Sequence, residues 1–137
     1  MAIPPPEAGL VISYAYLWLR EHEAGRKDRP SVIILNVRLA EDITKVVVLP
    51  ITHSRPTNPD NAIEFPVRIA RSIGLDALPS WIVISEANEF AWPGYDLRQS
   101  RADRFAYGFL PPRFFRQVAE GFLALRKSRR AKLISRD

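Results

Sequence analysis

The chain has 137 residues, no cysteine and a formal net charge of +5 at pH 7. This length fits a single domain with a core of its own, and the lack of cysteine excludes disulfides, zinc–thiolate sites and iron–sulfur clusters. No run approaches 18 apolar residues and the N-terminus has no basic n-region, so we expect no membrane partner, no signal peptide and a cytoplasmic protein.

The charge is unevenly divided along the sequence. Residues 1–97 hold nine basic and twelve acidic side chains, whereas residues 98–137 hold eleven basic and three acidic ones. Sixteen of the twenty cations are arginine, whose planar guanidinium matches phosphate and favours a nucleic-acid partner. A GC-rich genome gives the same arginine bias without such a partner. The basic character belongs to the C-terminal part. We interpret residues 126–137 as a tail that makes an auxiliary contact with RNA or a partner and that the fold does not need.

The N-terminal part predicts a short arm followed by strands. Residues 1–8 are rich in proline, and Gly9–Leu19 is rich in the valine, isoleucine, tyrosine and tryptophan typical of a strand. After a charged loop, Ser31–Val37 is almost entirely apolar and predicts a strand buried on both faces. Lys45–Ile51 is its expected antiparallel partner. Within it, Pro50 marks a strand end or an edge because proline cannot donate to the ladder.

The middle of the chain predicts shorter elements. Ala62–Phe65 is a short strand, and Pro66 opens a single short helix that Gly74 stops. Ser80–Ser85 is the next strand, and Glu89–Trp92 extends a neighbouring one. Short crossings of this kind favour an antiparallel arrangement over a βαβ sheet.

The only long helix is predicted to begin at Pro111 and Pro112 and to run to about Lys127. An apolar stripe with 3-4-3 spacing lies along it: Phe115, Val118, Phe122 and Leu125. We therefore expect one domain over residues 1–137, with an arm over 1–8, a body over 9–125 and the basic tail. The expected fold is mostly β, a small antiparallel and partly open barrel with a C-terminal helix.

Two loops carry the residues that are best suited to chemistry. Arg29 directly precedes the first buried strand, and Thr52 and His53 directly follow the second. If these strands pair as an antiparallel hairpin, the start of one lies beside the end of the other. A guanidinium, a hydroxyl and an imidazole around one point suit phosphodiester cleavage, because they stabilise phosphoryl charge, orient the phosphate and move protons. The alternative is a solvated basic loop beside a local turn held by Thr52.

Other catalytic signatures are missing from the sequence. His22 and His53 are too few for a three-histidine metal site, and no G-x-G-x-x-G, Walker or G-x-S-x-G motif occurs. We expect neither a metal nor a cofactor.

In their order and spacing, five segments resemble the MazF/PemK-type toxins. They are Gly9–Ile12 (GLVI), Arg29–Pro30, Val48–Ser54 (VLPITHS), Ala62–Phe65 (AIEF) and Leu75–Glu86, which contains SWIVIS. The resemblance implies an SH3-like barrel of the plasmid-toxin type and a homodimer. It also implies metal-independent cleavage of single-stranded RNA by the toxin of a type II toxin–antitoxin system, restrained by a small antitoxin protein.

Residue by residue, the resemblance makes Arg29 and Thr52 the positions most tied to cleavage. His53 is the candidate base beside them. The remaining residues expected to contact RNA are Arg26, Lys27, Ser54, Arg55, Glu86, Asn88 and Trp92.

The chain departs from the family pattern at three positions. Leu10 stands where the family usually has an acidic residue, and Glu86 and Asn88 stand where it commonly has a glutamine and then an arginine. The similar CcdB toxin acts on gyrase and cuts no RNA. A shared fold therefore does not fix an activity. The alternative function is therefore a non-catalytic module of the same fold that binds nucleic acid or protein.

Overall fold

The computed structural model describes residues 3–16, 18, 29–93 and 105–136. These contain strands β1 (Leu10–Tyr14), β2 (Arg29–Ala40), β3 (Ile43–Thr52), β4 (Ala62–Phe65), β5 (Ser80–Val83), β6 (Glu86–Ala91), β7 (Ala106–Phe109) and β8 (Lys132–Ser135). They also contain helices α1 (Val67–Ser72) and α2 (Pro112–Lys127) and a 3-10 turn, η1 (Pro59–Asn61).

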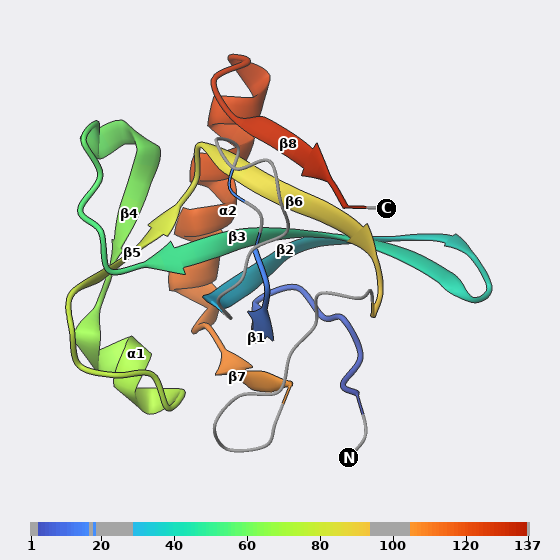
Figure 1. Ribbon diagram of the computed structural model, residues 1–137, viewed down its shortest axis with the longest axis horizontal. Helices are drawn as coiled ribbons and strands as arrows, with labels where there is room; N and C mark the ends of the chain where they lie inside the picture. Colours follow the sequence, from blue (N-terminus) through green and yellow to red (C-terminus); the bar gives the residue numbers. More distant parts are fainter. Residues whose placement is uncertain (1–2, 17, 19–28, 94–104, 137) are drawn as a thin grey trace.

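The strands form one curled sheet that α2 crosses on one side (Figure 1). Its strand order is β4-β5-β3-β2-β1-β7, and β6 pairs with a second part of β3. All these pairings are antiparallel, and β8 adds to β6 in parallel. The predicted fold class is confirmed: a mostly β chain whose antiparallel sheet forms a half-barrel, with one long helix near the C-terminus.

Strand β3 changes partner along its length, and Pro50 lies where the change occurs. One edge of β3 pairs with β2, while residues Lys45–Val48 pair with β6 on the other edge and Ile51–Thr52 pair with β5. Residues 49 and 50 fall between the two partners. Proline cannot donate a ladder hydrogen bond, so it is tolerated at this break in an otherwise central strand.

Helix α2 closes the main core against the sheet. Its buried side chains are Phe114, Val118, Phe122 and Leu125. The predicted stripe was wrong at its first position, because Phe114 and not Phe115 begins it. Phe115 is half-buried and packs against the edge of the core. Gly121 fits this interface because a Cβ there would come within 3.2 Å of methyl carbons of Ile63 and Ile84.

The opposite face of the sheet carries an aromatic cluster. Ring contacts run in sequence through Trp92, Phe90, Tyr14, Tyr16 and Trp18, with centroids 4.6 to 6.5 Å apart. Burial, and next the nearby carboxylate of Glu86, raises the pKa of the Tyr16 hydroxyl, which stays protonated. These rings form a packed row that leads from the core to Trp18 at one end of the sheet.

The C-terminal segment is part of the fold, which differs from the expected removable tail. Arg129 adopts φ 63° directly after α2, and this left-handed turn brings buried Ala131 against the core. The chain then forms β8, where Arg136 donates hydrogen bonds to the Ala15 carbonyl (3.2 Å) and the Asn88 side-chain oxygen (3.3 Å). A left-handed turn without glycine gives no sequence signal of this return.

Across the described residues, neither helix is long and apolar enough to cross a membrane.

Candidate functional site

Arg29 and Thr52 lie at the same end of the β2–β3 ladder. The register pairs Ser31 with Pro50, and Arg29 and Thr52 follow two positions further toward this end. Both side chains line two cavities, of about 530 Å³ and about 190 Å³. The two residues therefore form the wall that these cavities share, as the hairpin geometry predicted.

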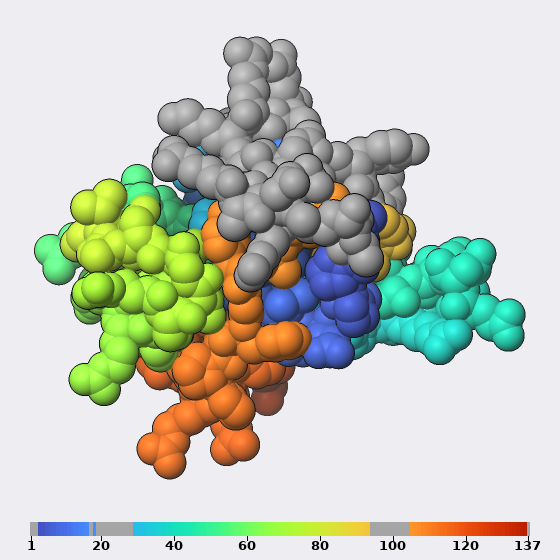
Figure 2. All heavy atoms as spheres, turned by 90° about the horizontal axis from the view of Figure 1, so that it is seen from below, coloured from blue at the N-terminus to red at the C-terminus, as the bar shows by residue number. Residues whose placement is uncertain are grey.

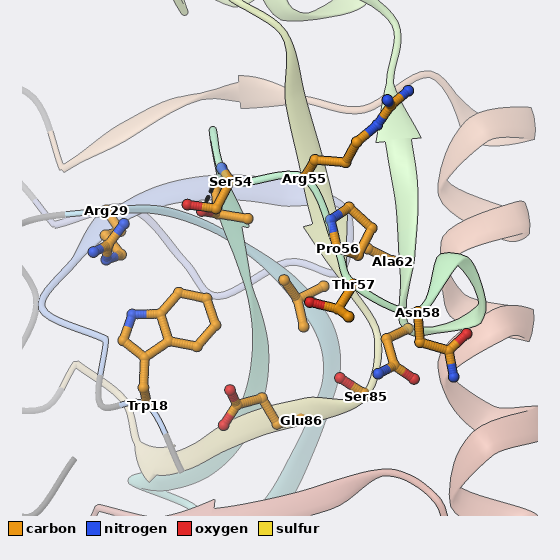
Figure 3. Close-up of a pocket in the computed structure, with 13 residues that line it drawn as sticks. Trp18, Arg29, Ser54, Arg55, Pro56, Thr57, Asn58, Ala62, Ser85 and Glu86 are labelled. Carbon is orange, nitrogen blue, oxygen red and sulfur yellow. Dashed lines mark hydrogen bonds between the residues drawn. The ribbon is translucent and has the colours of Figure 1, made fainter. Parts of the chain in front are cut away.

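The larger cavity has both polar and apolar walls and is built from three parts of the sheet (Figure 3). The loop after β3 supplies one rim, the antiparallel pair of β4 and β5 supplies a wall, and the start of β6 supplies the floor. The lining residues are Trp18, Arg29, Thr52, Ser54, Arg55, Pro56, Thr57, Asn58, Asn61, Ala62, Val83, Ser85 and Glu86.

Arg29 is held against an aromatic ring. Its guanidinium carbon lies 5.4 Å from the centroid of the Trp18 ring, a cation–π contact. Trp18 in turn packs edge-on against Tyr16 at 5.1 Å, so the aromatic row supports it from the core side. A cation fixed before substrate arrives stabilises developing negative charge without reorganisation.

Thr52 ends β3 with a local turn. Its Oγ1 accepts a hydrogen bond of 3.1 Å from the backbone N–H of Ser54, the turn that the sequence suggested as an alternative to a functional role. The hydroxyl hydrogen still has no part in that bond, because the oxygen acts as acceptor in it. The turn thus fixes the oxygen and leaves an O–H donor for a phosphate oxygen.

His53 faces the smaller cavity and does not line the larger one. Its Nδ1 lies 2.8 Å from the Pro79 carbonyl oxygen, and its Nε2 lies 3.2 Å from Oδ2 of Asp76. Both partners are acceptors, so both contacts are hydrogen bonds only when the ring carries two N–H groups. Each ring nitrogen therefore has a protein partner, and a role in proton transfer requires one of these two contacts to open.

Opposite charges line opposite sides of the larger cavity. Figure 3 shows Arg29 at one end of the cavity and Glu86 across from it, while the guanidinium of Arg55 points away from both. A phosphate is therefore attracted to the arginine side and repelled from the Glu86 side.

Two residues expected to contact RNA have structural roles instead. Asn88 is completely buried and accepts the hydrogen bond from Arg136. Trp92 lines neither cavity: its ring stacks on Phe90 at 6.2 Å, and its indole N–H donates to the Pro4 carbonyl at 3.1 Å. Arg26 and Lys27 lie outside the described residues, whereas Ser54, Arg55 and Glu86 line the larger cavity.

Sequence reasoning missed several lining residues. Asn58 and Asp76 come from polar loops and Asn61 ends η1, in a stretch whose polar composition signals only exposure. Asn58 also has a local role, because its side-chain oxygen caps η1 by accepting from the Asp60 N–H at 2.9 Å. Their convergence depends on how β4 and β5 fold over β3.

No cluster of three His, Asp or Glu side chains able to hold a metal ion exists within the described ranges. Neither the comparison with family models nor the search of curated proteins found a match for this chain.

Proposed function

We propose that this chain is a MazF/PemK-like endoribonuclease that cleaves single-stranded RNA without a metal ion. The observation that carries the proposal is the wall shared by the two cavities. Arg29 and Thr52 form it and stand where nucleotides on either side of one phosphate could be held. The sequence motifs, in their order and spacing, point to the same two residues.

In the proposed reaction, the 2′-hydroxyl attacks the adjacent phosphorus and the bond to the 5′ oxygen breaks. The products are a 2′,3′-cyclic phosphate and a free 5′-hydroxyl. The Arg29 guanidinium stabilises the negative charge on the phosphoryl oxygens, and the Thr52 hydroxyl donates to one of them. The attacking hydroxyl gives its proton to a water molecule and the leaving oxygen takes one up, so no net proton is consumed. His53 is the candidate donor to the leaving oxygen.

The expected partners belong to the same proposal. A cytoplasmic toxin of this type would form a homodimer and be restrained by a small antitoxin. The β2–β3 hairpin projects from the body and exposes apolar side chains that a protein interface would bury (Figure 2). Leu35, Val37, Leu39 and Ile43 are 39 to 59% exposed there.

The test is cleavage of single-stranded RNA by the purified protein in excess EDTA, followed by analysis of the new ends. We expect cyclic phosphate and 5′-hydroxyl ends, and no cleavage where the attacking nucleotide is 2′-deoxy. A requirement for divalent metal, or products with 3′-hydroxyl ends, would overturn the proposal. Tight RNA binding without any cleavage would favour the non-catalytic binding module.

A further inference from the structure

The larger cavity has room for more than a phosphate. Its volume of about 530 Å³ lies in the range of small-molecule sites, and it extends from the arginine side across to Glu86 and Ser85 (Figure 3). A phosphate held by Arg29 and Thr52 leaves the Glu86 side for another part of the substrate. That part must be uncharged or cationic, because the carboxylate repels an anion.

We infer that the Glu86 side of this cavity is a nucleobase subsite that selects guanine. The inference rests on the proposed function only in placing an RNA chain in the cavity, with a phosphate at Arg29 and Thr52. It adds the base that the neighbouring nucleotide carries.

The selectivity follows from the chemistry of a carboxylate. An ionised carboxylate only accepts hydrogen bonds, and its two oxygens match a pair of adjacent donors. Guanine presents such a pair, N1–H and the N2 amino group, on one edge. Adenine and cytosine present one amino group beside a ring acceptor, and uracil presents one N–H between two carbonyls. Each of these bases aims at least one acceptor at the carboxylate, which costs binding.

Glu86 is positioned for this role by the sheet. It is the first residue of β6, and it pairs with Lys132 of β8. The sheet therefore fixes the position of its backbone. Its carboxylate also lies close enough to Tyr16 to raise the pKa of that hydroxyl. A carboxylate has about four acceptor positions, so a contact with a neighbour leaves others for a base.

Trp18 completes the subsite with an aromatic surface. It lines the same cavity, and stacking on an aromatic ring binds every base with similar strength. Trp18 therefore contributes affinity without discrimination, and the discrimination among bases comes from Glu86.

The test measures binding separately from cleavage. Fluorescently labelled oligouridine with 2′-O-methyl groups throughout cannot be cleaved, and one central position is changed to guanine, inosine, adenine or cytosine. For the wild type we expect guanine to bind about tenfold more tightly than adenine, cytosine or uracil. Inosine, which lacks the N2 amino group, falls between them. Glu86→Gln reduces the guanine preference to within about twofold, whereas Glu64→Gln, at an exposed position that is not among the lining residues, leaves it unchanged.

Equal binding of all bases by the wild type overturns the inference, and so does a guanine preference that survives in Glu86→Gln. A Glu86→Gln variant that loses cleavage of every RNA but keeps the preference also overturns it, because Glu86 would then act on the reaction. Cleavage without base preference leaves the proposed function standing and removes the subsite. A guanine preference without cleavage supports the subsite and overturns the proposed function.

Discussion

Two arginines at different places on the sheet show how a very basic chain divides its cations. Arg29 begins β2 and lines two cavities, with its charge held against the Trp18 ring. Arg136 follows β8 and donates to a backbone carbonyl and to buried Asn88. The charge of Arg29 therefore faces cavities that a ligand can enter, whereas Arg136 joins the C-terminal segment to the sheet.

The difference shows that net charge is a poor guide to the functional surface here. Arg136 belongs to the strongly basic residues 98–137, but Arg29 comes from residues 1–97, where acidic side chains outnumber basic ones. A partly buried, hydrogen-bonded cation such as Arg136 stabilises the fold, while a cation at a cavity wall stabilises charge on a substrate. The two roles predict opposite mutational phenotypes.

The largest effect is expected at Arg29. Arg29→Ala removes the cation proposed to bind the phosphate, and we expect the cleavage rate to fall by about 10²- to 10³-fold with the unfolding midpoint little changed. The matched control is Arg38→Ala on the same strand, since Arg38 bonds only to carbonyls of its own turn among the described contacts. Rates on one single-stranded RNA in EDTA measure the difference, and equal rates for both variants would refute the role of Arg29.

Arg136→Ala should affect stability rather than activity. The variant leaves the Ala15 carbonyl and the Asn88 amide without their charged donor, which we expect to lower the free energy of unfolding by about 2 kcal/mol. Lys132→Ala, at an exposed position in β8, is the control and should cost less than about 0.5 kcal/mol. Urea denaturation measures both, and an unchanged midpoint for Arg136→Ala would show that β8 is dispensable.

A smaller effect is expected at Thr52. Thr52→Val keeps the side-chain shape but removes the hydroxyl, so the Ser54 N–H loses its acceptor and the phosphate loses a donor. We expect about a tenfold lower cleavage rate, and near wild-type activity for Thr52→Ser, which retains the hydroxyl. If Thr52→Val and Thr52→Ser cleave equally well, the hydroxyl has no role in the reaction.

The smallest effect on the site is expected from the far end of the β2–β3 ladder. Val37→Lys places a charge on the exposed apolar hairpin, and we expect it to shift a homodimer toward monomer because an interface would bury that charge. Glu41→Lys, at the exposed tip of the same hairpin, is the control. Sedimentation at micromolar concentration distinguishes them, and equal masses would place any dimer interface elsewhere.

Those parts of the fold and the site that depend on local sequence pattern could be predicted from the sequence. Alternating and continuous apolar runs predicted β2, β3 and β4, and antiparallel pairing of two adjacent strands brought Arg29 beside Thr52. The helix position was predicted as well, but the adjacent Phe114 and Phe115 differ by only about 100° around the helix, which spacing alone resolves poorly.

The rest depends on contacts between distant segments. Strand β8 is four residues long and pairs with β6 in parallel, so neither its length nor a hairpin turn reveals it. The position of Asn88 in the sequence suggests an RNA contact. In the fold Asn88 is buried beside β8 and accepts a hydrogen bond from Arg136. The cavity walls likewise form only when β5 pairs with both β4 and the end of β3.

The central claim is most directly tested by measuring the cleavage rate and the free energy of unfolding of Arg29→Ala and Arg136→Ala side by side, in EDTA and at a temperature where both are folded. We predict that Arg29→Ala is folded and cleaves RNA at least about 10²-fold more slowly than the wild type, while Arg136→Ala is less stable but cleaves RNA at nearly the wild-type rate. An active Arg29→Ala protein, or an Arg136→Ala protein that is fully stable and inactive, would contradict this division between a functional and a structural arginine.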